Sequence, residues 1–406
     1  MFERGRQAGV GALLAVMVLG TEGTAQRPQA RFEAAWAPVK QFFHETLTAE
    51  GVVGGAIMFV HGDTVVAREF HGLADRDANR PVDGRTIFHW ASITKTFTAI
   101  ALMQLVERGL LAVDDPVVRY VPELRLAHNP FGSIETITLA HLLSHSAGFR
   151  GGTWPWGGDK PWHPFEPTGW SQLVAMMPYT DVQFTPGTKF SYSNPGLIFV
   201  GRTIETLSGE DYEVYVDKNV LRPLGMTSSY FDRTPYHLLP RRSNNYEVRD
   251  GRAVANGLDF ETGITVSNGG LNGSIEDLAR YLQFLAGAPG LDRAARGVLD
   301  RKTLGLMWRP RLPRGGADGG QIGLGFFLQN VAGVPLVGHT GSQLAFRSFF
   351  WIDPTTKAGV VAVFNTAPAD DPRNPTDQGP DKPRIGMIFE GLLSRLAQGV
   401  FPLYRP

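Results

Sequence analysis

Residues 92–109 read SITKTFTAIALMQLVERG and combine a Ser-x-x-Lys spacing with an almost wholly apolar helix. Ser92 precedes Lys95 by three residues, and side chains three apart lie on one face of a helix. Apolar residues then occupy nearly every side of the helix as far as Arg108, and Gly109 ends it. Because a helix that is apolar all round is buried, the stretch predicts a core helix with a serine and a lysine side by side at its start.

Burial changes the chemistry that this lysine can perform. A lysine that loses its hydration has a lowered pKa and can act as a neutral base. Ser92 at the helix N-terminus would lie where backbone amides and the helix dipole favour negative charge. The alternative is structural: Ser92 caps the helix and Lys95 extends its amine to solvent. The spacing alone leaves both interpretations open.

The composition excludes several classes of protein. The 406 residues include 39 basic and 39 acidic side chains, 43% hydrophobic residues and no cysteine. The apolar fraction is that of a globular chain, and the zero net charge argues against a nucleic-acid-coating protein. Without cysteine there are no disulfides, thiolate metal sites or thiol nucleophiles. The lysine count is low, since Lys95 is one of eight.

The N-terminus has the layout of a secretory signal peptide. Arg4 and Arg6 precede an apolar stretch over residues 8–20, and small residues follow up to Ala25. A membrane span needs roughly 20 apolar residues, so we expect cleavage after Ala25 and a mature chain that is periplasmic or secreted. The alternative is an uncleaved N-terminal anchor.

Strand patterns lie at the two ends of the mature chain and helical patterns lie between them. A helix over 32–47 precedes a hairpin of residues 54–60 and 64–70, and further strands are predicted at 324–329, 346–352 and 359–365 before a helix over 385–398. We expect an α/β (α+β) fold with one antiparallel sheet formed by the N- and C-terminal segments and flanked by helices. Residues 26–109 and 310–406 would form this domain, with an inserted all-helical region, and 110–309 would be mainly helical. A capped helix is predicted after Ser274.

Two further motifs carry reactive or polar groups. Tyr192 and Asn194 offer a phenol, whose pKa a nearby lysine ammonium can lower, and an amide that can orient a lysine or a substrate. His339, Thr340, Gly341 and Ser342 precede the 346–352 strand, where free backbone N–H groups could hold an acyl substrate. Each motif alone is equally consistent with an ordinary turn.

Taken in order, the three motifs resemble those of the serine β-lactamase and penicillin-binding-protein family, which includes class C β-lactamases, D-Ala-D-Ala carboxypeptidases and related esterases. Three more stretches are similar to that family, at residues 138–148, 221–226 and 269–274. The resemblance covers residues 32–391 and implies the β-lactamase/transpeptidase-like fold. It also implies an acyl-enzyme mechanism on a small ester, amide or peptide-like substrate, with no metal or other cofactor.

The resemblance assigns a role to each motif residue. Ser92 would be the acylated nucleophile, Lys95 would assist its deprotonation, and Tyr192 would be the general base and later the acid. Asn194 would orient Lys95 and the substrate. Substrate would also contact His339, Thr340, Gly341 and Ser342, with the N–H groups of Ser92 and Ser342 forming the oxyanion hole.

His339 departs from the family pattern, because most β-lactam-cleaving members have lysine at this position. A histidine is mostly neutral at pH 7, so its attraction for a substrate carboxylate should be weaker. This favours an esterase or amidase over a β-lactamase or carboxypeptidase. A non-catalytic binding protein on the same scaffold is the third alternative.

Other features give no second function. His141 and His145 are four apart but lack the adjacent glutamate of zinc proteases, so we interpret them as structural. The segment from Trp154 to Trp170 holds four of the eight tryptophans and is either a self-packed loop or an aromatic wall over the site. No nucleotide-binding motif, nucleic-acid partner or protein partner is indicated.

Overall fold

The structure is a computed structural model that describes residues 1, 22–149, 167–257, 262–315, 319–368 and 385–405. Residues 2–21 of the predicted signal peptide and most of the tryptophan-rich segment lie outside this set. The helix that follows the predicted signal begins at Glu22, so the expected cleavage point after Ala25 falls in its first turns. Within the described ranges, no helix is long and apolar enough to cross a membrane.

One antiparallel sheet of nine strands organises the described part of the chain. Its order is β3-β2-β1-β14-β13-β12-β11-β10-β9. The strands are β1 (Gly54–His61), β2 (Thr64–Asp75), β3 (Arg80–Pro81), β9 (Leu312–Pro313), β10 (Gln321–Ile322), β11 (Phe327–Val331), β12 (Val334–Gln343), β13 (Phe346–Asp353) and β14 (Ala358–Phe364). β1 pairs with β14, from Gly55 opposite Phe364 to His61 opposite Ala358. The two ends of the chain therefore share one sheet, and the predicted fold class is confirmed.

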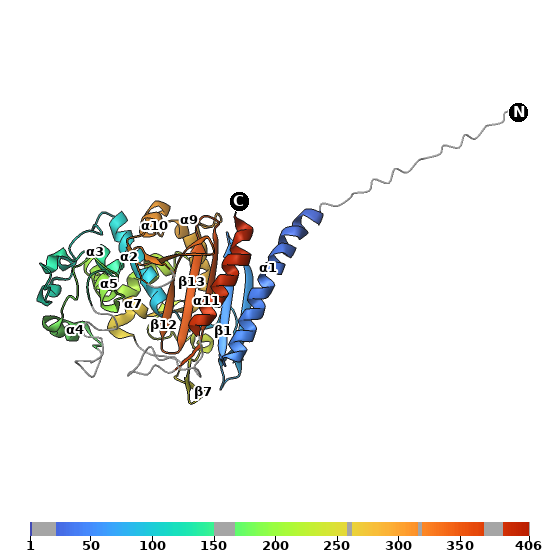
Figure 1. The fold of residues 1–406 in the computed structure, drawn as a ribbon, viewed down its shortest axis with the longest axis horizontal. Coiled ribbons are helices and arrows are strands. Elements are labelled where there is room, and N and C mark those ends of the chain that lie inside the picture. The colour runs from blue at the N-terminus through green and yellow to red at the C-terminus, as the bar shows by residue number, and fades with distance from the viewer. Residues whose placement is uncertain (2–21, 150–166, 258–261, 316–318, 369–384, 406) are drawn as a thin grey trace.

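Two helices cover the outer face of the sheet, α1 (Glu22–Ala49) and α11 (Ile385–Arg395) (Figure 1). The buried residues of α1 follow helical spacing, at Phe32, Trp36, Val39, Phe43 and Leu47. They pack with strand residues and with the C-terminal helix in one hydrophobic cluster. A stripe of this spacing buries one side of a helix against the sheet.

The inner face carries the larger core and the remaining helices. These are α2 (Thr94–Glu107), α3 (Leu139–Leu143), α4 (Trp170–Met176), α5 (Asn194–Ser208), α6 (Tyr212–Val216), α7 (Val266–Gly269), α8 (Ile275–Ala286), α9 (Arg293–Arg296) and α10 (Arg301–Met307). Figure 1 shows α2, α5 and α7 on the side of the sheet away from α1 and α11. Ser274 caps α8 by accepting a hydrogen bond from the Asp277 N–H, as the sequence predicted.

The middle of the chain is not all-helical, which corrects the expected insertion. One small sheet joins β4 (Ile87–His89), β8 (Leu271–Ser274) and β5 (Tyr230–Phe231), and another joins β15 (Thr366–Pro368), β6 (Tyr246–Arg249) and β7 (Arg252–Ala255). These strands are short, and β8 and β6 pair with β4 and β15 from other parts of the chain. Local periodicity does not reveal such pairing. The division into two domains stays a prediction.

The late strands also differ in detail from the sequence expectation. The strand predicted at 324–329 is β11 and begins at Phe327. The residues around His339, expected as a turn or strand edge, belong to the ten-residue strand β12. One proline and two glycines within that stretch, Pro335, Gly338 and Gly341, obscure its strand pattern.

Candidate active site

Ser92 and Lys95 lie side by side where a single 3₁₀ turn, Ala91–Ile93, leads into α2. Ser92 is partly exposed, and Lys95 is fully buried. The Lys95 Nζ donates hydrogen bonds to Ser92 Oγ at 2.9 Å and to the Asn268 carbonyl at 2.7 Å. Burial holds the pKa of Lys95 well below its ordinary value. A neutral amine in this position can take the Ser92 proton.

The turn that presents Ser92 is held in an unusual backbone conformation. Ala91 has φ of +49°, a left-handed value that is uncommon for a residue other than glycine. The Thr94 hydroxyl donates to the Ala91 carbonyl at 2.6 Å, and the Trp90 N–H donates to the Leu271 carbonyl at 2.8 Å. A strained backbone conformation persists only where several surrounding contacts hold it in place. The surrounding hydrogen bonds therefore fix the direction of Ser92.

Tyr192 lies against Lys95, with its ring centroid 5.0 Å from the lysine Nζ. Burial raises the pKa of Tyr192, and a hydrogen bond with Ser92 only partly offsets the rise. The sequence predicts that a lysine ammonium near this phenol lowers its pKa. The direction is opposite because Lys95 is itself desolvated and favours the neutral form. In the free protein, Tyr192 is therefore a neutral phenol, and Lys95 is the better base.

Asn194 is the first residue of α5, which Ser193 caps by accepting from the Gly196 N–H at 3.3 Å. Its Oδ1 is buried without a hydrogen-bond partner in the described structure. The contact to Lys95 expected from Asn194 is instead made by the carbonyl of Asn268 on α7. A backbone carbonyl gives no signal in a sequence, so this contact could not be predicted from motifs.

His339 lies on the inner side of β12 and is 1% exposed. Its Nδ1 donates to the Thr340 carbonyl at 2.6 Å, and its ring stacks on Phe327 with centroids 4.1 Å apart. Burial lowers the pKa of His339 to about 3. The imidazole is thus neutral at physiological pH and offers a substrate carboxylate no fixed charge.

The rest of this motif forms an open strand edge. β11 pairs with β12 only as far as Gly338, so residues 339–343 pair with β13 alone. Thr340 and Ser342 are exposed there. A Cβ on Gly341 would lie 2.3 Å from the Trp90 carbonyl oxygen, so only glycine lets the strand approach the turn of Ser92 this closely. The three predicted motifs are therefore brought to one place.

His145 also belongs to this place, although its spacing from His141 indicated only a structural role. Its ring centroid lies 4.4 Å from that of Tyr192, and the residue is 2% exposed. α3 ends at Leu143 and His145 has φ of +51°, so His141 and His145 do not share a helix face. In the described residues no group of side chains could hold a metal ion. Nothing in the spacing of the two histidines indicates the contact with Tyr192.

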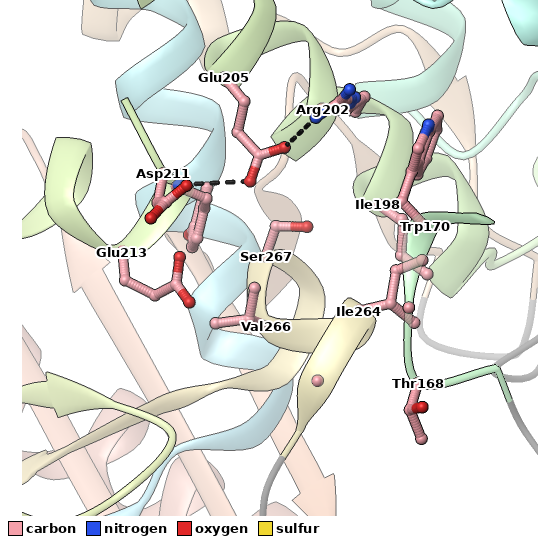
Figure 2. A pocket seen from close by; sticks show the side chains of 14 residues that line it. Thr168, Trp170, Ile198, Arg202, Glu205, Asp211, Glu213, Ile264, Val266 and Ser267 are labelled. Atoms are coloured by element: carbon pink, nitrogen blue, oxygen red, sulfur yellow. Dashed lines mark hydrogen bonds and ion pairs between the residues drawn. The ribbon is translucent and has the colours of Figure 1, made fainter. Parts of the chain in front are cut away.

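A separate cavity of about 210 Å³ lies beside α5, α6 and α7 (Figure 2). Ser92, Lys95, Tyr192 and His339 do not line it. The carboxylate of Glu205 in this cavity already has hydrogen-bond partners, because it accepts from Arg202 Nη1 at 3.0 Å and from the Tyr212 N–H at 3.3 Å. Trp170, the one tryptophan of that segment among the described residues, lines this cavity and donates to Glu123. The structure therefore places Trp170 beside this cavity and not among the four motif residues.

Comparison with known proteins identifies the family. Residues 39–379 match the family described as Beta-lactamase. The esterase EstB of Burkholderia gladioli is 32% identical over 282 residues, which cover 61% of this chain and 69% of EstB. The octameric penicillin-binding protein homologue from Pyrococcus abyssi is 32% identical, with a TM-score of 0.69 and coverage of 81% of this chain and 73% of that one.

A class C β-lactamase shares the fold at 19% identity, with a TM-score of 0.71 over 91% of this chain and 97% of that one. The family match spans most of the 406 residues, and it includes Ser92, Lys95, Tyr192 and His339. The chain therefore belongs to the β-lactamase family.

Proposed function

We propose that the protein is an exported serine hydrolase that cleaves an ester or amide bond through an acyl-enzyme on Ser92. The observation that carries the proposal is the 2.9 Å hydrogen bond between Ser92 Oγ and the fully buried amine of Lys95. A serine hydroxyl is a weak nucleophile until a neighbouring base removes its proton. A lysine kept neutral by burial is such a base.

The reaction follows from the positions of these groups. Lys95 takes the Ser92 proton as Oγ bonds to the substrate carbonyl carbon, and the carbonyl π electrons move to the oxygen. The N–H groups of Ser92 and Ser342 would bind that oxyanion. When the tetrahedral intermediate collapses, the leaving group takes a proton from Tyr192, which regains one from Lys95. Water then repeats the sequence on the acyl-enzyme and releases the acid.

Two observations favour an uncharged ester over a β-lactam or a peptide C-terminus. His339 is neutral, so this residue offers a carboxylate no positive charge where most β-lactam-cleaving members have a lysine. EstB, at 32% identity, is an esterase by name. Charge-assisted hydrogen bonds are roughly twice as strong as neutral ones, so a neutral His339 binds an anionic substrate more weakly than a lysine would.

A fluorophosphonate probe followed by peptide mass spectrometry tests the nucleophile. We expect labelling of Ser92 in the wild type and none in Ser92→Ala. An unlabelled but folded wild type would refute the proposal and favour a binding protein. Turnover of p-nitrophenyl butyrate should exceed that of nitrocefin, and efficient nitrocefin hydrolysis would favour the β-lactamase alternative.

Export is tested separately by expressing the full chain in a bacterial host and separating the cell fractions. We expect the protein in the periplasm or medium with Gln26 at its N-terminus. A cytoplasmic product that retains Met1 would contradict the signal-peptide interpretation.

A further inference from the structure

His145 contacts the segment that carries Tyr192 on both sides of that residue. Its carbonyl accepts a hydrogen bond from the Ser191 N–H at 2.8 Å, and its Nδ1 accepts one from the Ser193 N–H at 3.1 Å. Its ring lies over the Tyr192 ring, with centroids 4.4 Å apart and planes at 31°. One residue therefore restrains the backbone before and after Tyr192 as well as its ring.

The protonation state of His145 suits this arrangement. A backbone N–H can only donate, so Nδ1 must be the unprotonated nitrogen and Nε2 carries the hydrogen. Burial holds the pKa of His145 well below its ordinary value, so the ring stays neutral. Nδ1 therefore remains available as an acceptor over the physiological range.

The backbone at His145 is also specialised. Its φ of +51° is left-handed, a conformation that asparagine and histidine adopt more readily than most residues. The residue is buried, and its Nε2 has no hydrogen-bond partner in the described structure. A buried N–H without a partner costs stability, so packing alone does not account for a histidine here.

We infer that His145 is the positioning residue that holds the Tyr192 phenol on the Ser92–Lys95 pair. This inference rests on the proposed function, because it concerns the proton transfer through Tyr192. Tyr192 is kept in place through two backbone hydrogen bonds and a ring contact, and His145 itself need not touch the substrate. Its effect should therefore be on turnover and not on substrate binding.

Two substitutions separate the hydrogen bond from the ring contact. His145→Phe keeps an aromatic ring but leaves the Ser193 N–H without its acceptor. His145→Asn places an amide oxygen near the former Nδ1 position and tolerates the left-handed backbone. We expect H145F to lower kcat about 100-fold, as a misplacement of about 1 Å does, with KM changed less than about threefold. H145N should retain at least about a tenth of the wild-type kcat.

His141→Phe is the matched control. His141 Nδ1 also accepts a backbone hydrogen bond, from the Thr138 N–H at 3.3 Å, but Ser191 and Ser193 do not bond to it. H141F should lose comparable stability and keep its kcat. If H145F does not fold, His145→Gln replaces it, because that amide reaches the Nε2 position and not the Nδ1 position.

A second readout does not depend on activity. With 3-fluorotyrosine incorporated, the Tyr192 fluorine resonance is assigned by its loss in Tyr192→Phe. We expect this resonance to shift or broaden in H145F and to stay unchanged in H141F. A wild-type kcat in folded H145F, or an unchanged resonance, would overturn the inference. Should wild-type Ser92 resist acylation while the resonance still moves in H145F, the proposed function fails and the positioning of Tyr192 stands.

Discussion

Gly341→Ala should displace β12 without changing the chemistry of its side chains, because it adds one methyl group and no polar atom. The new Cβ would lie 2.3 Å from the Trp90 carbonyl oxygen and 2.4 Å from Ser348 Oγ. Ordinary contacts begin at 3.4 Å, so β12 and the turn of Ser92 must separate by about 1.1 Å.

The size of the effect follows from that separation. A misplacement of about 1 Å between reacting groups costs about 100-fold in rate. Inserting a methyl group into a packed site costs about 1–3 kcal/mol of stability. We therefore expect G341A to fold, to melt at a lower temperature and to lose about 100-fold in kcat on p-nitrophenyl butyrate.

Two glycine substitutions serve as controls for G341A. Gly359→Ala on β14 would bring its Cβ within 2.9 Å of Ile352 and 3.3 Å of Leu282, so it also overfills a strand position. It should lower stability and leave kcat unchanged. Gly305→Ala on α10 meets nothing within 4 Å and should raise stability by about 0.4–1 kcal/mol. If G341A is folded and keeps the kcat of G359A, the close approach at Gly341 does not position Ser92.

Three further predictions concern charge. Lys95→Met should abolish acylation of Ser92 yet raise the unfolding free energy at pH 7 by about 0.5–3 kcal/mol. Because the pKa of Lys95 is lowered in the folded chain, the unfolded chain binds the lysine proton more tightly, and this destabilises the folded wild type. Methionine removes that cost. This gain should shrink as the pH rises towards 10.5, the ordinary lysine value, and a constant difference in chemical denaturation between pH 7 and pH 10 would contradict it. Burial lowers the pKa of His89 to about 4, so its neutral form stabilises the fold above pH 6.5 and this contribution is lost as the pH falls towards 4. His89→Gln should remove about 3 kcal/mol of that acid dependence, whereas denaturation curves with an unchanged pH slope would show that His89 is not the titrating group. His339→Lys should shift the nitrocefin-to-ester ratio of kcat/KM about tenfold towards nitrocefin, and an unchanged ratio would mean that charge at this strand does not select the substrate.

The sequence was most informative where residues close in the chain act together. The Ser92–Lys95 pair, the β1–β2 hairpin and the Ser274 cap all depend on spacings of a few residues, and each appears as predicted. The family resemblance then added the distant motifs at Tyr192 and His339, which no local pattern could bring together. The sequence pattern that would predict strand β12 is interrupted by the proline and glycines of that strand.

What the sequence alone determined is the set of reactive groups and the kind of core that surrounds them, since an apolar helix with one lysine must bury that lysine. What only the tertiary structure decided is the electrostatic state of the site and the contacts made across it. The Asn268 carbonyl replaces Asn194 as the partner of Lys95, and His145 restrains Tyr192. The pKa of Tyr192 rises instead of falling. The physical reason is that desolvation and hydrogen bonding depend on neighbours from distant parts of the chain, which no spacing in the sequence encodes.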